Sequence, residues 1–198
     1  MTKDTVVIGI SGPSGSGKTA LCQCLEKLLP DSMVLQQDLY FKPAGSLSEF
    51  DNFCDLDCLL LERFIRDVVF ISSGEAIQAP NLDLNTFERL DGFLVFKRSR
   101  YVLIEGMTIF RIPEIYSLFN YRFYLSPGMD EIRRRKTQRD LEHRRKTKDE
   151  IEYQLSWVEQ EYIYDLENLP GGINFISGNS STEQICQQVF NHILGEAR

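Results

Sequence analysis

The segment with the clearest chemical potential is Gly12-Pro13-Ser14-Gly15-Ser16-Gly17-Lys18-Thr19, which fits the spacing G-x-x-x-x-G-K-[ST]. Glycines let the backbone curl so that successive N–H groups point at phosphate oxygens, and a helix start adds partial positive charge. In this pattern the lysine bridges the β- and γ-phosphates of a nucleotide and the Thr hydroxyl binds Mg²⁺. An ordinary glycine-rich turn is the alternative. The apolar run before the segment and the amphipathic run after it favour a nucleotide site at Gly12, Ser14, Gly15, Ser16, Gly17, Lys18, Thr19 and Ala20.

Two carboxylates follow short apolar runs in the same way. Asp38 comes after Met33 to Gln36, and Glu105 ends Tyr101-Val102-Leu103-Ile104. Nucleotide-bound Mg²⁺ needs hard oxygen ligands near the ends of neighbouring strands, so we predict a metal site at Thr19, Glu105 and Asp38. Asp38 could also accept the proton of an attacking hydroxyl. The alternatives are an Asx turn or helix cap for Asp38 and a plain surface carboxylate for Glu105.

A third feature is a basic segment near the middle of the second half of the chain. Nine Lys and Arg side chains gather there: Arg133, Arg134, Arg135, Lys136, Arg139, Arg144, Arg145, Lys146 and Lys148. A local cationic patch suits a lid that closes over a transferring phosphoryl group. Helical spacing puts Arg135 and Arg139 on one face. A solvated helix face, paired with Asp140, Glu142 and Asp149, is the alternative.

Composition limits the class of protein that can carry these residues. The chain has 198 residues and a formal net charge of −7, which argues against binding to nucleic acid. No run reaches the roughly 18 apolar residues of a membrane span, and no secretory signal is visible, so we expect a cytoplasmic protein without a membrane partner. Oligomeric state is not predicted. The five cysteines, an odd number in largely helix-like patterns, are expected to be reduced thiols: Cys22, Cys24, Cys54, Cys58 and Cys186.

Strand-like runs that alternate with helical runs must position these side chains. This alternation predicts one α/β domain over residues 1–198, with a parallel sheet covered on both faces. We expect strands at Val6–Ser11, Met33–Gln36, Tyr101–Glu105, Tyr121–Leu125 and Asn174–Ser177. Helices are expected at Lys18–Leu29, Leu56–Ile71 and Thr182–Ala197, with a charged helical region broken near Arg144–Thr147 and continuing to about Leu169. Asp38–Asp55 reads as a loop, and Ala76–Phe96 as a β-ribbon with its turn at Leu90-Asp91-Gly92.

The order of these segments resembles the uridine kinase and nicotinamide riboside kinase family nearly from end to end. The resemblance is carried by the G-x-x-x-x-G-K-[ST] loop, or P-loop, and by Gln37-Asp38-Leu39-Tyr40-Phe41-Lys42-Pro43, Phe50-Asp51, Leu103-Ile104-Glu105-Gly106 and the Arg-rich lid. It implies a P-loop kinase fold with a five-stranded parallel sheet, a β-ribbon (about 76–96) over the acceptor site and a lid (about 133–148). ATP would be the co-substrate, Mg²⁺ the cofactor and a small ribonucleoside the acceptor.

The resemblance also implies roles for single residues. Asp38 would be the catalytic aspartate, with Lys18, Arg135 and Arg139 also in catalytic positions. Asp51 would hold the ribose hydroxyls together with Arg135. Further residues would bind ATP, namely Arg139 and Arg144 at the phosphates and Gly178 and Asn179 near adenine. The acceptor would contact Asp38, Tyr40, Phe41, Asp51, Phe87, Glu105 and Arg135.

The identity of the acceptor depends on the ribbon. Ala79 to Arg89 is similar to a uridine kinase stretch that offers a tyrosine and a histidine to the pyrimidine, but Leu82 and Phe87 stand at those places. Apolar side chains cannot hydrogen-bond a uracil edge. Phe-Lys-Pro after Asp38 and the short chain look more like the nicotinamide riboside kinases, whose cationic ring could stack on Phe87, Tyr40 or Phe41. Phe87 could instead be a ribbon core residue.

Nicotinamide riboside is therefore the expected acceptor. Uridine, cytidine or another small alcohol remain alternatives. A nucleotide-binding switch without an acceptor is an alternative of another class, and so is a family member that binds but does not react. The chain contains no Asn-Lys-x-Asp guanine motif, which disfavours a GTPase.

Overall fold

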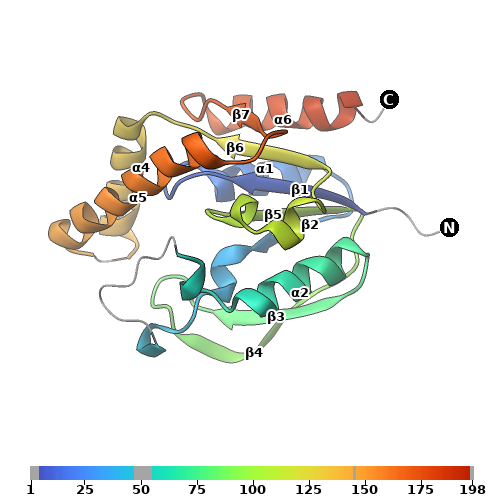
Figure 1. The fold of residues 1–198 in the computed structure, drawn as a ribbon, viewed down its shortest axis with the longest axis horizontal. Helices are drawn as coiled ribbons and strands as arrows, with labels where there is room; N and C mark the ends of the chain where they lie inside the picture. The colour runs from blue at the N-terminus through green and yellow to red at the C-terminus, as the bar shows by residue number, and fades with distance from the viewer. Residues whose placement is uncertain (1–4, 47–54, 145, 197–198) are drawn as a thin grey trace.

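The computed structural model describes residues 5–46, 55–144 and 146–196. Its central sheet has five parallel strands in the order β2-β5-β1-β6-β7 (Figure 1). This confirms the five-stranded parallel sheet that the sequence resemblance implied. The strands are β1 (Val6–Ser11), β2 (Ser32–Gln36), β5 (Tyr101–Gly106), β6 (Tyr121–Leu125) and β7 (Asn174–Ile176).

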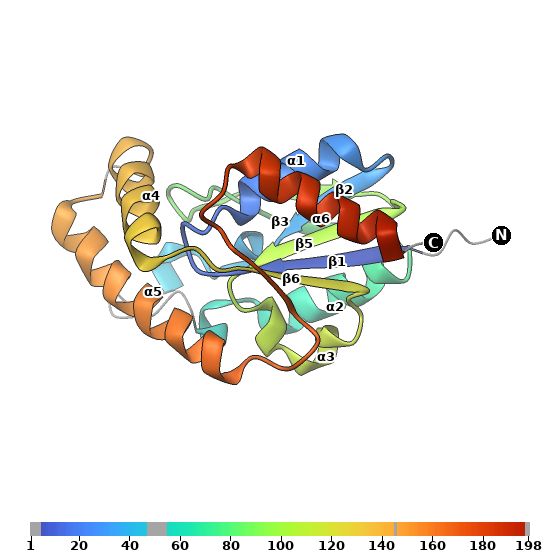
Figure 2. The ribbon, with the colours of Figure 1, turned by 90° about the horizontal axis from the view of Figure 1, so that it is seen from above.

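Helices cover both faces of this sheet, as Figure 2 shows from above. Helices α1 (Lys18–Leu28) and α6 (Thr182–Glu196) lie on one face. Helices α2 (Leu61–Ser72), α3 (Pro113–Tyr116) and α5 (Lys148–Asn168) lie on the other. Alternate side chains of each strand enter two separate cores, so that Ile8 and Ile10 pack with α1 and α6 while Val7 packs with α2 and α3. The strands are buried on both faces, which explains their continuous apolar runs.

Helix α4 (Met129–Glu142) and the first turns of α5 extend beyond the sheet (Figure 2). The break between them is made by a capping box at Thr147. The Thr147 hydroxyl accepts a hydrogen bond from the Glu150 N–H at 3.3 Å, and the Glu150 carboxylate accepts one from the Thr147 N–H at 2.7 Å. The predicted break near Arg144–Thr147 is therefore confirmed, and the two helices form a helical hairpin.

Helix α2 begins later than the sequence pattern predicted. Leu56–Cys58 forms a short 3₁₀ turn, and the α-helix begins at Leu61. Residues 58–60 pair with the segment after β2: the Leu60 N–H donates to the Tyr40 carbonyl, and the Cys58 carbonyl accepts the Lys42 N–H. Long-range pairing thus replaces the first turn of the expected helix.

The ribbon exists, but its turn is not where the sequence pattern placed it. Strands β3 (Ile77–Leu82) and β4 (Arg89–Phe96) are antiparallel, and the chain reverses at Asp83–Glu88. Leu90-Asp91-Gly92 lies inside β4 as a bulge opposite Asn81, and Gly92 takes a φ of +79° there. The hairpin prediction for this tripeptide is therefore wrong, because its glycine serves a bulge.

The expectation of reduced cysteines is wrong for one pair. Cys24 of α1 and Cys186 of α6 form a disulfide across the face that the two helices share. Cys22 and Cys58 are buried free thiols, and Cys54 lies outside the described residues. In the part of the chain that the structure describes, no helix has the length and apolar character needed to cross a membrane.

Candidate active site

The P-loop connects β1 to α1, and its backbone takes a conformation that needs glycine at three positions. Gly12, Gly15 and Gly17 take φ angles of +145°, +87° and +100°. A Cβ on Gly12 would lie 2.5 Å from the Leu125 carbonyl oxygen, so this position requires glycine on steric grounds as well. The backbone therefore has the curled conformation that a phosphate cradle needs.

Two side chains of this loop have polar groups suited to a phosphate. The Lys18 ammonium is buried and donates to the carbonyls of Gly12 at 2.8 Å and Pro13 at 3.1 Å. Burial lowers the pKa of Lys18, and the carboxylates of Glu105 and Asp38 act against that shift. The Ser16 hydroxyl is buried and has no hydrogen-bond partner among the described residues. A polyphosphate at the loop would give the Ser16 hydroxyl an acceptor and the Lys18 ammonium an anionic partner.

Glu105 stands at the carboxyl end of β5, next to the P-loop helix. Its carboxylate accepts hydrogen bonds from the Thr19 hydroxyl at 2.7 Å and the Gln36 amide at 3.0 Å. Burial raises the pKa of Glu105, the charge of Lys18 lowers it and the charge of Asp38 raises it again. Asp38, Lys18, Thr19 and Glu105 line one cavity of about 360 Å³. The carboxylates that the sequence singled out are thus brought to the P-loop.

The residues present fit Mg²⁺ bound together with a nucleotide. Thr19 offers a hydroxyl, and Glu105 and Asp38 offer carboxylates on the same cavity. No cluster of three or more His, Cys, Asp or Glu side chains suited to a metal occurs within residues 5–46, 55–144 and 146–196. Mg²⁺ commonly takes only one or two protein carboxylates and fills its remaining positions with phosphate oxygens and water. The small donor set is therefore the kind expected for a nucleotide-associated metal.

The turn that carries Asp38 is tied to the end of β5 by two glutamines that the sequence analysis did not single out. The Gln37 amide donates to the Thr108 hydroxyl at 2.9 Å, and its carbonyl accepts the Thr108 N–H at 3.2 Å. Gln36 binds Glu105 directly, as described above. A glutamine after a strand is an ordinary sequence feature, so only the structure reveals that this pair joins the two carboxylate-bearing segments.

Tyr40 does not line this cavity, which corrects its assignment as an acceptor contact. Its side chain is fully buried, its ring packs edge-on against Phe64 and its hydroxyl donates to the Asp67 carboxylate at 2.9 Å. The turn points Tyr40 into the core and Asp38 into the cavity. Tyr40 therefore anchors the turn.

Two lid arginines line the cavity at the P-loop: Arg139 belongs to α4 and Arg144 follows the end of that helix. The Arg139 guanidinium donates to the Ser14 hydroxyl at 3.3 Å and to the buried carboxylate of Asp140 at 2.8 Å. Arg144 lies 3.8 Å from the same carboxylate, and Lys136 donates to it at 2.5 Å. One buried aspartate thus gathers three lid cations beside the cavity, and one of them, Arg139, reaches the P-loop. The nearby Arg145 lies outside the described residues.

Arg135 of α4 connects the P-loop to the loop after β7 and lines the same cavity as Asp38. Its guanidinium donates to the Ser16 carbonyl at 3.3 Å, to the Gly178 carbonyl at 3.0 Å and to Glu131 at 2.6 Å. It borders both the main cavity and a second cavity of about 200 Å³ lined by Leu21, Leu125, Ser180, Ser181, Thr182 and Ile185, among others. Its expected contact with the acceptor ribose stays a prediction.

The loop after β7 forms the outer wall of that second cavity. Gly178 packs on Pro127, where an added Cβ would meet ring carbons at 2.8 Å, and the Asn179 side chain accepts the Gly128 N–H at 3.0 Å. Both residues thus join the loop to the start of α4. Arg135 links the Gly178 carbonyl to the Ser16 carbonyl of the P-loop. The adenine contact that the resemblance implied for Gly178 and Asn179 stays a prediction.

The remaining wall of the main cavity is aromatic and apolar. Phe41 follows the Asp38 turn and meets Phe87 edge-on, with ring centroids 5.9 Å apart. Phe87 lies in the β3–β4 turn with a φ of +57°, an uncommon conformation for an aromatic residue. Met107 and Trp157 complete this wall, and the sequence analysis did not single out either. Asp51, the expected ribose ligand, lies outside the described residues.

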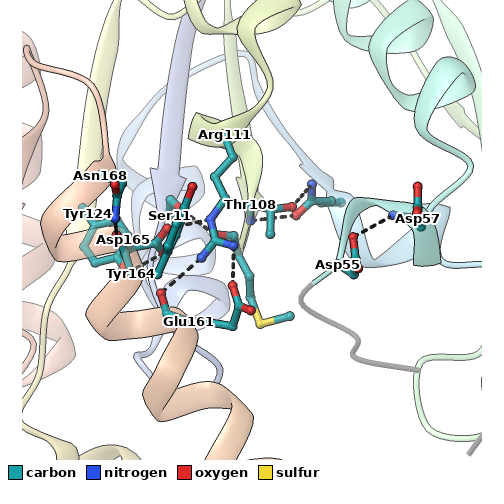
Figure 3. Close-up of polar contacts among 12 residues, drawn as sticks. Ser11, Asp55, Asp57, Thr108, Arg111, Tyr124, Glu161, Tyr164, Asp165 and Asn168 are labelled. Carbon is teal, nitrogen blue, oxygen red and sulfur yellow. Dashed lines mark hydrogen bonds and ion pairs between the residues drawn. The ribbon is translucent and has the colours of Figure 1, made fainter. Parts of the chain in front are cut away.

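A polar network fixes the C-terminal half of α5 behind the P-loop. Figure 3 shows Arg111 between Glu161 and Asp165, and the Arg111 Nε donates to Asp165 at 2.6 Å. The Tyr124 hydroxyl of β6 donates to the other oxygen of Asp165 at 2.8 Å. Because this end of α5 is held to the sheet, the α4–α5 hairpin has a fixed base.

Comparisons with known proteins confirm the sequence resemblance. No family model matches the chain. A uridine kinase from Borrelia hermsii is 28% identical over 166 residues, which cover 81% of this chain and 80% of that protein. Human nicotinamide riboside kinase 1 is 24% identical over 199 aligned residues, covering 97% of this chain and 94% of that enzyme.

Solved structures agree on the fold. A protein from Silicibacter sp. TM1040 described as a fructose transport system kinase superposes with a TM-score of 0.70, at 19% identity over 88% of this chain and 89% of that one. A possible uridine kinase from Bacillus stearothermophilus gives a TM-score of 0.57, at 18% identity over 89% and 91%. At these identities the likeness establishes a P-loop kinase fold.

Proposed function

We propose that this chain, a relative of the uridine kinases and nicotinamide riboside kinases, transfers the γ-phosphoryl group of ATP to the 5′-hydroxyl of a ribonucleoside. One observation carries the proposal. Lys18, Asp38 and the Thr19–Glu105 pair line a single cavity that also has an aromatic wall. A phosphate grip, a candidate base and a place for a flat ring thus meet within one site.

The arrangement accounts for each part of the transfer. The acceptor hydroxyl oxygen forms a bond to the γ-phosphorus, the bond to the β-phosphate oxygen breaks, and ADP leaves. Asp38 takes the hydroxyl proton. Lys18, Arg139 and Arg144 face the phosphate end of the cavity and would hold the negative charge that spreads over the phosphoryl oxygens. When bound, Mg²⁺ neutralises phosphate charge, and Thr19, Glu105 and Asp38 are the residues that would hold it.

Nicotinamide riboside is the proposed acceptor. The Gln37–Pro43 motif and a match that spans nearly the whole of human nicotinamide riboside kinase 1 support this choice. The aromatic wall of Phe41 and Phe87 offers a stacking surface for a planar base. Asp51 would hold the ribose hydroxyls, as the resemblance implies.

A pyrimidine nucleoside is the second candidate, and the position of Arg144 favours it. The Arg144 guanidinium lies over the Phe87 ring, 6.0 Å from its centroid. A cationic pyridinium stacked on that ring would be repelled by the guanidinium charge at close range. A neutral pyrimidine in the same place would not be repelled. Uridine and cytidine therefore belong in any test of the acceptor.

The test is turnover with a panel of acceptors. ADP release and formation of the acceptor phosphate are measured with ATP, Mg²⁺ and nicotinamide riboside, uridine, cytidine or no acceptor. We expect the highest kcat/KM with nicotinamide riboside. ADP release that no acceptor increases would reject the kinase proposal and favour a nucleotide-binding switch.

Asp38→Asn is the matched variant for this assay. It keeps the side-chain shape and removes the base, so we expect ATP binding to persist while kcat falls at least about 10²-fold. Equal losses of ATP affinity and rate would show that Asp38 has a structural role instead.

A further inference from the structure

Arg89, the first residue of β4, reaches from the ribbon to the turn that carries Asp38. Its guanidinium donates to the carbonyl of Leu39 at 2.9 Å and to the carbonyl of Phe41. We propose that Arg89 is a positioning residue that holds Asp38 in the orientation needed for proton transfer. The inference rests on the proposed function and adds a residue that neither the sequence pattern nor the comparisons assign.

The backbone of this turn shows why two hydrogen bonds from one side chain matter. The Asp38 carbonyl accepts the Phe41 N–H at 3.2 Å, and the Tyr40 carbonyl accepts the Leu60 N–H at 2.7 Å. The other two carbonyls of the turn, those of Leu39 and Phe41, are the ones that Arg89 binds. Arg89 therefore supplies half of the carbonyl hydrogen bonds that fix the backbone on which Asp38 sits.

The chemistry of this contact requires arginine. A guanidinium presents several N–H donors in a rigid fork, so two of them can reach two carbonyls at once, whereas a lysine ammonium is a compact charge on a flexible stem. No carboxylate within the described ranges forms an ion pair with Arg89, and burial together with the charge of Arg63 lowers its pKa. The side chain is therefore committed to the backbone of the turn.

Arg89 also connects the turn to the aromatic wall. Phe87 lies two residues before Arg89 and contacts Phe41, whose own carbonyl Arg89 binds. The ribbon turn and the Asp38 turn are thus held together as one unit. An acceptor that packs against the wall would meet Asp38 in a fixed geometry, which is what positioning catalysis requires.

The experiment compares Arg89→Gln and Arg89→Lys with Arg122→Gln. Arg122 is a matched control because its guanidinium also binds a backbone carbonyl, that of Tyr116, away from the cavity. For both Arg89 variants we expect kcat to fall about 10- to 10²-fold with the best acceptor, since misplacement by about 1 Å can cost that much. The KM for ATP should stay within about twofold of wild type, and Arg122→Gln should keep wild-type kinetics.

A double-mutant cycle separates positioning from general damage. If Arg89 acts through Asp38, its loss should matter little in a protein that already carries Asp38→Asn. In that background we expect Arg89→Gln to lower kcat by less than about threefold, because the two losses are not additive. A loss of the same size in both backgrounds would overturn the proposal, and so would an unchanged kcat in both Arg89 variants.

Hydrogen exchange tests the contact independently of catalysis. The Phe41 N–H closes the turn and the Lys42 N–H donates to Cys58, so both amides should exchange faster in Arg89→Gln than in wild type or Arg122→Gln. If wild type phosphorylates no nucleoside, the proposed function fails while this measurement still reports on Arg89. Unchanged exchange at both amides would overturn the positioning role.

Discussion

At the scale of single residues, Lys146 gives the cavity a group that titrates near neutral pH. Burial, followed by the neighbouring charge of Lys136, lowers the pKa of Lys146 to about 8, although Asp140 acts in the opposite direction. The ammonium donates to the Gln154 side chain at 2.9 Å and lines the cavity that holds Lys18 and Arg139. Lys146 is therefore charged at pH 7 and largely neutral at pH 9.

We predict that the KM for ATP rises by up to about fivefold between pH 7 and pH 9, which corresponds to about 1 kcal/mol for a partly screened charge pair. Lys146→Arg keeps the charge and should flatten this dependence. Lys148→Arg is the control, because Lys148 is exposed and lies outside the cavity lining. Steady-state kinetics across this pH range check the prediction. The same slope in Lys146→Arg as in wild type would contradict it.

The lowered pKa of Lys146 also determines how its contribution to the free energy of unfolding changes with pH. Its folded-state pKa lies below the ordinary lysine value of 10.5, so the unfolded chain binds more protons between about pH 8 and 10.5. The contribution of this group to the free energy of unfolding therefore rises with pH in that window.

The residues whose positions could be predicted from sequence were those placed by a local pattern. Lys18 and Thr19 belong to a contiguous loop motif. Asp38 follows β2 and Glu105 lies at the carboxyl end of β5, so parallel topology brings both to one edge of the sheet. Tyr40 was assigned wrongly because nothing in the sequence shows which way a turn residue points. Its partner Asp67 is 27 residues away.

At the scale of elements, the turn after β2 packs against the end of β5, and this contact requires Gln37 to lie close to Gly106. A Cβ on Gly106 would lie 2.3 Å from the Gln37 Oε1 and 2.5 Å from the Gln37 Cβ. Gly106→Ala should therefore push Gln37 away from Thr108. We expect a loss of about 1–3 kcal/mol in the free energy of unfolding, typical of overpacking, and a lower kcat.

Denaturant unfolding and kinetics measure this effect, with Gly171→Ala as the control. A Cβ at Gly171 would meet no atom within 4 Å, so that variant should match wild type. Wild-type stability and rate in Gly106→Ala would show that the junction can relax.

The lid hairpin depends on the buried carboxylate of Asp140. This fully buried carboxylate binds Lys136 and Arg139, and it lies 3.8 Å from Arg144. Burial raises the pKa of Asp140, but its hydrogen bond from Lys136 and the nearby cations lower it below the ordinary value. Asp140→Asn removes the shared countercharge, so we expect about 3–5 kcal/mol of destabilisation.

Thermal unfolding checks this prediction, with Asp149→Asn as the control, since Asp149 is exposed in the first turn of α5. If Asp140→Asn unfolds at the same temperature as the control, the cations do not depend on the shared carboxylate.

Helices and strands could be predicted where the periodicity of apolar residues determines their position. They were misplaced where segments distant in sequence pair with each other. The five strands follow from apolar runs, and the break predicted near residues 144–147 matches the gap between α4 and α5. The start of α2 was predicted five residues early because residues 58–60 pair with the segment near Phe41, a contact that no local pattern encodes. Leu90-Asp91-Gly92 was read as a turn because a bulge and a turn both use glycine at positive φ.

At the scale of the whole molecule, the Cys24–Cys186 disulfide joins the first and last helices of the fold. The two cysteines are 162 residues apart in sequence, so the cross-link closes most of the chain into one loop. A cysteine count could not reveal this pair, because it depends on α1 and α6 lying side by side on one face of the sheet (Figure 2). Helix α1 carries Lys18 and Thr19 in its first turn, so the bond fixes the nucleotide side of the site to the C-terminal helix.

We predict that reduction of this disulfide lowers the free energy of unfolding by about 2–4 kcal/mol, because cross-linking removes conformational entropy from the unfolded chain. For a domain of this size the melting temperature should then fall by roughly 5–15 °C. Thermal unfolding with and without dithiothreitol measures the change. Cys24→Ser should unfold at the temperature of the reduced wild type and should not respond to dithiothreitol. A wild-type melting temperature that dithiothreitol leaves unchanged, with Cys24 and Cys186 shown to be alkylated, would contradict the stabilising role.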